Sequence, residues 1–411
     1  MLTPYRVLDL TDEKGFLCGR ILGDLGADVI KVEKPGGDAS RNIAPFYHGE
    51  IDSKKSLYWW AYNCSKRGIT LDIETEDGKE IFRRLAQKSD VVVESFYPGY
   101  MDELGLGYAQ LNEVNPEIIM TSITPFGQTG PNKDYKASDL VIWAMGGLLF
   151  HCGDPDRAPV RIGFPQACLH AGSAAAQGTM IALYYRGLTG EGQHVDVSML
   201  ESTICTLMHI RPFWELSGLE PQRAGQFRID IMSGTGCVAR MVWPCQDGYV
   251  MFSLMGGATG APGNRALVQW MDEEGMAPDF LKRDWEAWDL VKATQEDFDL
   301  FQQPIGEFFQ QHTQAELHEG ALKRNIMFYP VNTTKQILED PQLESRGFWQ
   351  LVEHPESGTE IKYPGSFVKL SAASCEIRRR APLAGEHNTD IYKELGFSEA
   401  EITTLKQANV V

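Results

Sequence analysis

The chain of 411 residues is 43% hydrophobic and 10% aromatic, and this length and composition predict a soluble globular protein with two domains. A net charge of −18 argues against a nucleic-acid partner, which favours a basic surface, and against binding to an anionic membrane. The eight cysteines show no metal-ligand spacing and no signal peptide is apparent, so we expect reduced thiols, no zinc site and a cytoplasmic location.

The first 125 residues alternate between strand and helix patterns. Strand patterns cover residues 5–10, 28–35, 68–73, 90–96 and 117–123, and helix patterns cover 15–26 and 76–88. A helix that connects two strands of one sheet makes the strands parallel. The repeated alternation therefore predicts an α/β fold with a doubly wound, Rossmann-like domain.

The next segment predicts a loop, a long helix and a further strand. Prolines and glycines interrupt any periodicity in 125–138, which predicts a loop. Residues 169–185 form a helix pattern rich in alanine and glycine, which suits close packing, and 194–199 form a strand pattern.

The composition changes between about residues 225 and 330, which predicts a second, smaller domain. A strand pattern at 248–254 precedes a glycine-rich stretch, GGATGAPG (256–263), which we expect to be a loop. Acidic helices that carry Trp270, Trp285 and Trp288 are expected to follow. From residue 330 the patterns return to short elements and loops.

Seven segments stand out along the chain. They are DLGADVIKVEKPGGDASR (24–41), NCSKRGITLD (63–72), DVVVESFYPG (90–99), LGLGYAQLNEVNPEII (104–119), SITPFGQTGP (122–131), RGLTGEGQHVDVSMLE (186–201) and APLAGEHN (381–388). In this order they resemble the signatures of the class III CoA-transferases, a family that also includes acyl-CoA racemases. The resemblance covers nearly the whole chain.

The resemblance implies a large α/β domain built from both chain ends and a smaller α+β middle domain. We expect the large domain to comprise residues 1–224 together with the returning segment 331–411, and the small domain to comprise 225–330. The family also implies that two subunits interlock like links of a chain, with each active site between the large domain of one subunit and the small domain of the other.

Cys168 stands where the family carries its catalytic aspartate, within PVRIGFPQACLHAGSAAAQGTMIALYYRGLTGEGQHVDVSMLES (159–202). In the family this carboxylate is acylated and then carries CoA as a thioester, which requires an acyl carbon on the enzyme. A thiol provides no such carbon, so no catalytic residue is predicted in this chain and racemase activity is disfavoured. Two readings remain for Cys168: a small residue on a close-packed helix, or a nucleophile of acyl-thioester or other thiol chemistry. His170 does not share its helical face.

The resemblance also implies where this chain would contact coenzyme A. Candidate cations that match or lie close to the family's basic positions are Lys34, Arg41, Lys66 and Lys136. Ser95 and Phe96 are further candidate contacts and stand where the family usually has Asn-Phe. For Lys34 in particular, a solvated surface cation is an equally good reading. Glu103 occupies a position where the family usually has arginine, and this charge reversal opposes binding of a polyphosphate. Asp12 to Phe16 replace a segment that is usually small and neutral.

Glycines and acidic residues elsewhere allow a few further assignments. Gly256, Gly257 and Gly260 match a mobile glycine loop that the family places over the neighbouring subunit's site, although a plain strand-to-helix connection is equally consistent. The first strand is not followed by GxGxxG, which disfavours a nicotinamide site. Asp139 and Asp196 are interpreted as structural.

These features predict the non-catalytic subunit of a heteromeric CoA-transferase whose aspartate lies on a homologous partner chain, in an interlocked heterodimer or an α2β2 assembly. No cofactor is expected to be bound covalently; the coenzyme A thioester is a substrate, held mainly by the partner. The segments SITPFGQTGP, AMGG and CGDPDRAPVRIGFPQA are similar to a branch of the family that moves CoA from succinyl-CoA to (R)-benzylsuccinate in anaerobic toluene degradation. The alternatives are a homo-oligomeric binding or scaffold protein, and a stand-alone transferase that uses Cys168.

Overall fold

The computed structural model describes residues 1–229 and 236–411, and it divides into two compact units. Unit 1 comprises Met1–Leu148, Ile162–Met208 and Pro341–Val411, and unit 2 comprises Leu149–Arg161 and His209–Asp340. The sequence predicted changes of domain after residues 224 and 330, whereas the units change after 208 and 340. A segment before residue 162 also belongs to unit 2, and it carries no compositional signal that distinguishes it from its neighbours.

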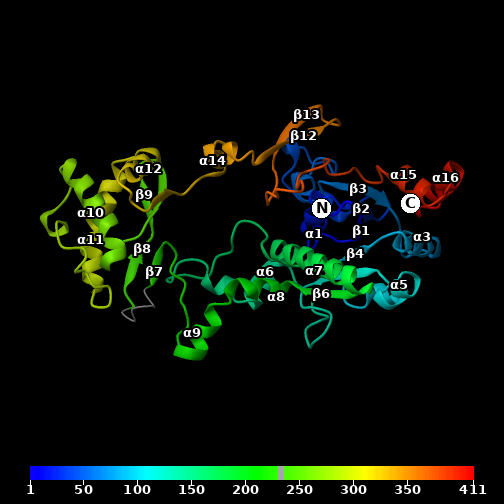
Figure 1. Cartoon of the computed structure of the whole chain (residues 1–411), viewed down its shortest axis with the longest axis horizontal. Helices are drawn as coiled ribbons and strands as arrows, with labels where there is room; N and C mark the ends of the chain where they lie inside the picture. The colour runs from blue at the N-terminus through cyan, green and yellow to red at the C-terminus, as the bar shows by residue number, and fades with distance from the viewer. Residues whose placement is uncertain (230–235) are drawn as a thin grey trace. The chain divides into compact units, whose positions relative to one another are not determined.

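A six-stranded sheet forms the centre of unit 1 (Figure 1). Its strands lie in the order β3 (Lys66–Thr70), β2 (Asp28–Glu33), β1 (Arg6–Asp9), β4 (Val91–Glu94), β5 (Ile119–Thr124) and β6 (His194–Ser198). Every neighbouring pair is parallel. The predicted parallel sheet is therefore confirmed, and the strand order reverses between β1 and β4, which is where sheets of this kind bind ligands.

Helices cover both faces of this sheet. On one face lie α1 (Phe16–Asp24) and the long α7 (Ala167–Thr189), which pack against each other. A Cβ at Gly172 of α7 would come within 2.9 Å of the Leu17 side chain of α1. The predicted role of small residues in close helix packing is therefore seen at this contact.

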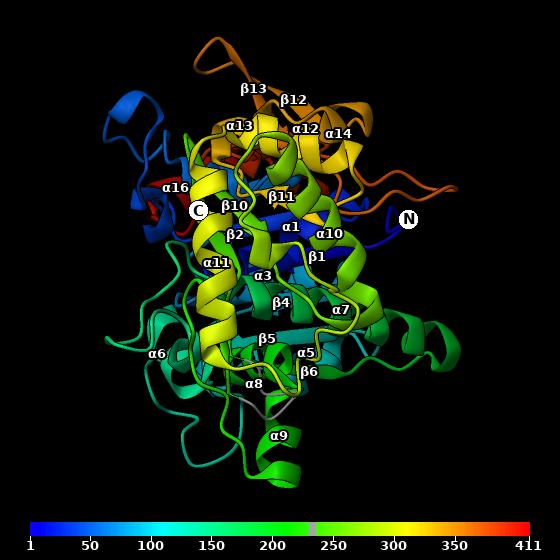
Figure 2. The same cartoon turned by 90° about the vertical axis from the view of Figure 1, so that its left-hand side faces the viewer.

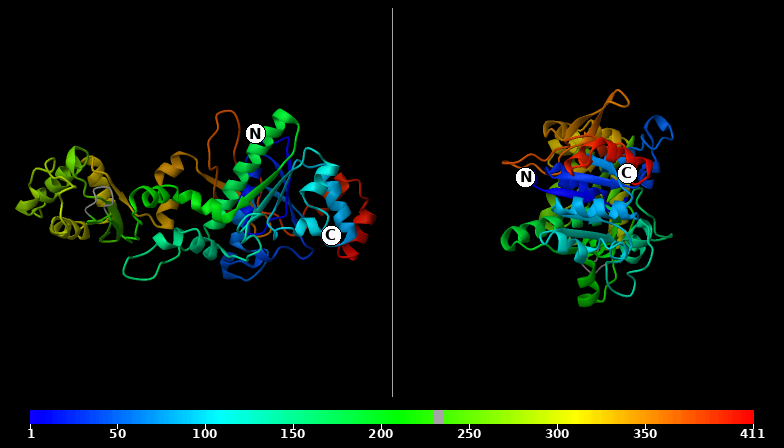
Figure 3. Two further views of the ribbon diagram at one scale, coloured as in Figure 1. Left: turned by 90° about the horizontal axis from the view of Figure 1, so that it is seen from below. Right: turned by 90° about the vertical axis from the view of Figure 1, so that its right-hand side faces the viewer.

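The other face of the sheet carries α3 (Glu76–Gln87), α5 (Tyr108–Val114) and the C-terminal helices α15 (Asn388–Glu394) and α16 (Glu399–Gln407). Alternate residues of the strands, including Leu8, Ile30 and Val92, pack there against Phe82 of α3 and Tyr392 of α15. Figure 3 shows the red C-terminal helices beside the light-blue α3. Both ends of the chain thus contribute to one core.

Shorter elements complete unit 1. They are η1 (Ala39–Asn42), η2 (Tyr47–Gly49), α2 (Leu57–Tyr62), α4 (Tyr100–Glu103), α6 (Asp139–Met145), α8 (Met199–Ile204), η4 (Cys205–Leu207), α14 (Pro341–Ser345), β12 (Trp349–His354) and β13 (Thr359–Pro364). A further short helix, η3 (Leu148–His151), runs across the change from unit 1 to unit 2. The strands β12 and β13 form an antiparallel hairpin.

Unit 2 combines small antiparallel sheets with helices (Figure 2). One sheet has the order β11 (Phe328–Pro330), β10 (Gly248–Phe252) and β9 (Val242–Cys245), and β7 (Phe227–Ile229) pairs with β8 (Val238–Arg240). The helices are α9 (Ile210–Ser217), α10 (Gly257–Glu273), η5 (Asp279–Leu281), α11 (Gln295–Gln310), α12 (Gln314–Lys323) and α13 (Thr334–Leu338).

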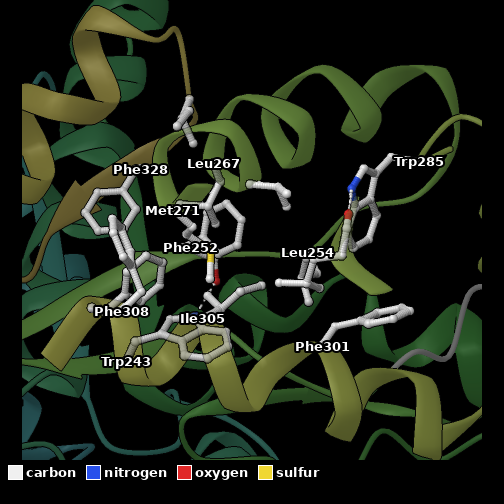
Figure 4. Packing of buried hydrophobic residues seen from close by; sticks show 14 of the residues in the cluster. Trp243, Phe252, Leu254, Leu267, Met271, Trp285, Phe301, Ile305, Phe308 and Phe328 are labelled. Atoms are coloured by element: carbon white, nitrogen blue, oxygen red, sulfur yellow. Dashed lines mark hydrogen bonds between the residues drawn. The ribbon is translucent and has the colours of Figure 1, made fainter. Parts of the chain in front are cut away.

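Aromatic side chains dominate the core of unit 2 (Figure 4). The Trp243 indole N–H donates to the carbonyl of Phe252 at 2.8 Å, and that of Trp285 donates to Leu281 at 3.0 Å, so both polar groups are satisfied in an apolar setting. Trp285 and Trp288 belong to no helix, contrary to the prediction, because they lie in the connection between η5 and α11.

No helix within the described part of the chain is long and apolar enough to cross a membrane.

Candidate functional site

A pocket of about 380 Å³ opens at the carboxyl ends of β1, β4 and β5. Three connecting segments supply its lining residues: Lys14, Ser95, Phe96, Tyr97, Pro98, Pro125, Lys133, Asp134, Tyr135, Lys136 and Ala137. Lys14 follows β1 and Ser95 follows β4, the two strands between which the strand order reverses. We call this cavity the switch-point pocket, since its position is the one at which open α/β sheets bind ligands.

Two hydrogen bonds hold the walls of the switch-point pocket together. The backbone N–H of Asp12 donates to the Ser95 hydroxyl at 2.9 Å, and that hydroxyl donates to the Asp12 carboxylate at 2.8 Å. The Lys14 ammonium forms an ion pair with the same carboxylate. The loop after β1 is therefore fastened to the turn after β4, which positions Lys14 at the edge of the pocket.

The charges that line the pocket favour an anionic ligand. Lys14, Lys133 and Lys136 contribute three cations, against the single carboxylate of Asp134. Both Lys133 and Lys136 are exposed, and within residues 1–229 and 236–411 no acidic group lies in ion-pair range of either. Such unpaired ammonium groups are suited to phosphate groups. Phe96, Tyr97 and Tyr135 provide flat apolar surface beside them.

Glu103, the residue predicted to oppose polyphosphate binding, lies next to this pocket. Its carboxylate accepts a hydrogen bond from the Tyr97 hydroxyl at 2.7 Å, and Tyr97 lines the pocket. Glu103 itself does not contribute to the lining. Its negative charge is therefore adjacent to the candidate anion site.

Of the six predicted coenzyme A contacts, the structure brings together three: Ser95, Phe96 and Lys136 all line the switch-point pocket. Lys34, Arg41 and Lys66 do not. The Lys34 ammonium forms an exposed ion pair with Glu74 at 2.7 Å. The role of each as a ligand contact stays a prediction, but the three outside the pocket each have another partner.

Arg41 is one of those three, and its guanidinium is buried. It forms two bonds of 2.7 Å to the Glu33 carboxylate and donates to the Pro382 carbonyl at 3.0 Å. Its planar group lies 3.8 Å from the centre of the Trp59 ring. This bidentate, stacked arrangement ties β2 to the C-terminal segment.

Lys66 is fully buried in β3. Its ammonium lies 2.8 Å from Oδ2 of Asp9 and donates to Oδ1 of Asn63 at 2.9 Å and to the carbonyl of Phe16 at 3.0 Å. Burial lowers the pKa of Lys66, and the Asp9 carboxylate opposes this effect. The Lys66 ammonium is thus paired within the core and faces no solvent.

Cys168 lies at the second position of α7 and is 5% exposed. Its backbone N–H donates to Oδ1 of Asp139 at 3.2 Å. Burial raises the pKa of the Cys168 thiol, and the negative charges of Asp139, Glu13 and Asp12 raise it further, against a smaller opposing effect of Lys14. A helix N-terminus ordinarily favours a thiolate, but here burial and acidic neighbours prevail, so the thiol is protonated at neutral pH and is a weak nucleophile.

His170 lines a different pocket, formed by α7, β6 and α8, to which Cys168 does not contribute. Ser173, Asp196 and Glu201 contribute to the same lining. The geometry offers no base for the Cys168 thiol from this histidine.

Gly256, Gly257 and Gly260 belong to unit 2, and the expectation of a loop at 256–263 is wrong. Gly256 is the N-cap residue of α10, Gly257 is its first residue with a φ of 67°, and Gly260 lies inside the helix. A Cβ at Gly260 would lie 2.0 Å from the carbonyl oxygen of Met255, so glycine is needed there for close packing. Gly256 and Gly257 therefore form the turn into α10, and Gly260 packs against the residue before that turn.

Sequence reasoning missed most of the pocket lining, including Lys14, Tyr97, Lys133 and Tyr135. Lys133 and Tyr135 lie in the predicted loop 125–138. The sequence therefore predicted the loop but not that these two residues line a pocket. Lys14 belongs to the segment that was interpreted as a departure from the family pattern. Its place after the first strand of a parallel sheet is the signal that could have found it.

Comparisons with known proteins identify the family of this chain. A model described as CoA-transferase family III matches residues 2–388. The chain is 34% identical to the succinyl-CoA:(R)-benzylsuccinate CoA-transferase subunit BbsE of Thauera aromatica, over 99% of this chain and 97% of that protein. It is 31% identical to the succinyl-CoA–D-citramalate CoA-transferase of Chloroflexus aurantiacus, over 100% and 98% of the two chains.

The fold is also similar to that of a solved protein. A CAIB/BAIF family protein from Brucella suis superimposes with a TM-score of 0.82 and 30% identity, over 96% of this chain and 99% of that one. The resemblance found in the sequence is thus confirmed over nearly the full length, and the chain belongs to CoA-transferase family III.

Proposed function

We propose that this chain is the non-catalytic subunit of a heteromeric CoA-transferase, and that the aspartate which is acylated lies on a homologous partner chain. The observation that supports the proposal is that Cys168, which the sequence resemblance matches to the family's aspartate, is a buried thiol whose pKa is raised by burial and by neighbouring carboxylates. The function would be to complete the partner's site and to stabilise an interlocked heterodimer or α2β2 assembly.

The atom balance of the reaction supports this reading. A carboxylate that accepts the acyl group forms a mixed anhydride, and the released CoA thiolate attacks the enzyme's own acyl carbon, which leaves CoA bound as a thioester. Cys168 attacking an acyl-CoA would form an acyl-cysteine thioester. The CoA thiolate could then only reverse that step, because the enzyme would offer it no acyl carbon.

The similar proteins support a substrate class. The subunit from Thauera aromatica and the enzyme from Chloroflexus aurantiacus both carry succinyl-CoA in their names, together with a dicarboxylic acceptor. We propose succinyl-CoA as the donor and a carboxylic acid such as (R)-benzylsuccinate as the acceptor, in anaerobic toluene degradation.

The switch-point pocket is the part of this chain that would contact coenzyme A. Lys14, Lys133 and Lys136 supply the cations that a polyphosphate needs, while Phe96 and Tyr97 supply apolar surface. The adjacent carboxylate of Glu103 supports the view that the partner holds most of the coenzyme. Gly256, Gly257 and Gly260 are proposed to approach the partner's site at the start of α10.

Co-expression with a homologous chain that carries the aspartate tests the proposal. We expect a stable 1:1 complex that transfers CoA from succinyl-CoA only when both chains are present. Replacing the partner's aspartate by alanine should abolish transfer, whereas Cys168→Ser in this chain should retain it. A homodimer that does not bind the partner would favour a scaffold protein. If this chain alone were active and Cys168→Ser abolished that activity, thiol catalysis would be favoured.

A further inference from the structure

A chain of hydrogen bonds connects a buried carboxyl group to the surface of unit 1. Glu94, the last residue of β4, is 3% exposed and is paired in register with Ser122 of β5. Its carboxylate accepts the backbone N–H of Phe96 at 2.7 Å and a hydrogen bond from the Ser122 side chain. The Ser122 hydroxyl in turn lies 2.9 Å from Nε2 of His194.

The outer end of this chain is accessible. The residue His194 is exposed, and its ring stacks on Tyr108 with ring centres 5.7 Å apart. Glu94, Ser122, Tyr108 and His194 together line a cavity of about 90 Å³, which shares Tyr97 with the switch-point pocket. Nothing in the transferase chemistry proposed above uses these residues.

We propose that Glu94 is a positioning residue for the wall of the switch-point pocket, and that Ser122 and His194 carry protons between it and solvent. The wall in question is the turn Ser95–Phe96, whose N–H group Glu94 holds. Its effect on coenzyme A rests on the proposed function, whereas the proton uptake itself does not.

The proton balance is complete without any further reactant. With Glu94 ionised, His194 carries its proton on Nε2 and donates to Ser122, which donates to the carboxylate. A proton from solvent binds Nδ1 of His194, the Nε2 proton passes to Ser122, and the Ser122 proton passes to Glu94. Each hydrogen bond is then reversed: Glu94 donates to Ser122, and Ser122 donates to Nε2 of a neutral His194.

The electrostatic surroundings favour binding of that proton to Glu94 near neutral pH. Burial raises the pKa of Glu94 to about 7, while hydrogen bonds from Ser122 and Phe96 and the charge of Lys14 lower it and Asp12 raises it.

The histidine at the other end of the chain behaves differently. Partial desolvation lowers the pKa of His194, with the carboxylates of Asp196 and Asp102 opposing this effect. Burial thus favours the protonated, neutral form of Glu94 and the neutral form of His194.

Protonation of Glu94 weakens its hold on the turn. A hydrogen bond from an N–H group to a carboxylate is about twice as strong as one to a neutral acceptor. The turn is also held by two hydrogen bonds between Ser95 and Asp12, and this proton does not change them. The turn would stay in place but become less rigid, which reduces the affinity of the pocket for its ligand.

The direct test uses the full-length chain without ligand. The protein is labelled with 15N-phenylalanine, and the amide resonance of Phe96, identified by its loss in Phe96→Leu, is followed from pH 5.5 to 8.5. We expect it to move with a midpoint near 7, to stay fixed in Glu94→Gln, and to titrate with a higher midpoint in Ser122→Ala, because the bond that favours the carboxylate is lost. The amide of Phe82 is the internal reference.

Glu103→Gln is the matched control, since it removes a nearby exposed carboxylate that holds Tyr97 and should leave the Phe96 midpoint unchanged. A Phe96 resonance that does not move, or that moves equally in Glu94→Gln, would overturn the proposal. An unchanged midpoint in Ser122→Ala would remove Ser122 from the chain and overturn the proton path.

The second measurement is the affinity for coenzyme A of the complex with the partner. Between pH 8 and pH 6 we expect it to fall about fivefold more in the native protein than in Glu94→Gln, consistent with the loss of one charge-assisted hydrogen bond. If Phe96 titrates but no coenzyme A binds, the positioning role stands and the proposed function fails. Equal pH dependence in both proteins would overturn the link to the ligand.

Discussion

The carboxylate of Asp139 accepts a hydrogen bond from the backbone N–H of Cys168 at 3.2 Å, at the first turn of α7. This places a negative charge where an additional anionic side chain would meet repulsion. Burial and the charges of Asp139, Glu13 and Asp12 raise the pKa of the thiol. The position therefore favours a small, uncharged side chain.

Cys168→Ser should retain CoA transfer in the assembled complex to within about twofold, because a protonated thiol contributes no nucleophile. Cys168→Asp should not create activity in this chain alone. Instead, its thermal unfolding midpoint should fall as the pH rises from 5 to 8, since a buried carboxyl beside Asp139 resists ionisation. Scanning calorimetry at several pH values checks this, and a gain of transfer by the aspartate variant would contradict it.

The alkylation rates of two cysteines should differ strongly. Cys168 is buried and its pKa is raised, whereas Cys205 is exposed. In the isolated full-length chain at pH 7.5, iodoacetamide should modify Cys205 at least about tenfold faster than Cys168, because only accessible thiolate reacts. Mass spectrometry of digested samples over time measures both rates. Rapid labelling of Cys168 would restore the thiol-catalysis alternative.

Glu94→Gln should stabilise the fold in a pH-dependent way. The pKa of Glu94 is raised from 4.5 to about 7, so between these values the native state binds a proton that the unfolded chain has lost. The stability of the native protein therefore falls as the pH rises through this window.

The glutamine variant lacks this dependence, and its advantage should grow by on the order of 3 kcal/mol between pH 4.5 and pH 8. The difference in thermal midpoint between the two proteins, measured across this range, reports the effect. A constant difference would show that the pKa of Glu94 is not raised in the folded protein.

Lys133→Ala and Lys136→Ala should each weaken coenzyme A binding about fivefold at low salt, with a smaller effect at 0.5 M salt, because exposed charge contacts are screened. Lys34→Ala is the matched control: its ammonium pairs with Glu74 outside the pocket, so the affinity should change little. Isothermal titration at two salt concentrations distinguishes the variants, and a larger loss in Lys34→Ala would place the ligand elsewhere.

Lys66→Met should destabilise unit 1 by about 3 kcal/mol or more, because it removes the closest cation from the fully buried Asp9 carboxylate. Lys34→Met, at an exposed ion pair, should cost less than about 1 kcal/mol. Urea unfolding of both variants gives the comparison. If Lys66→Met instead kept the stability of the native protein but lost coenzyme A binding, the prediction that Lys66 contacts the ligand would be supported.

Local patterns were sufficient to predict the six strands of unit 1 and its helices α1, α3 and α7. The apolar runs at 28–35 and 90–96 predicted β2 and β4, and the alternation with helices predicted their parallel arrangement. Hydrophobic periodicity carries this information because burial in a sheet constrains every residue of a strand. Hydrophobic periodicity was less informative in unit 2, where a loop was predicted at 256–263 but α10 begins there. Glycine is compatible with both loops and helix ends, so its presence did not distinguish them.

The amino-acid sequence by itself determined the sheet and the family, because each is encoded in adjacent residues, and it predicted that Cys168 replaces the family's aspartate. Only the tertiary structure decided which cations reach the pocket. Lys66 and Lys136 were both predicted from the sequence as coenzyme A contacts. In the structure Lys66 is buried in an ion pair with Asp9, whereas Lys136 lines the switch-point pocket. The reason is physical: whether a charge is buried and paired depends on groups distant along the chain, which folding brings within a few ångströms.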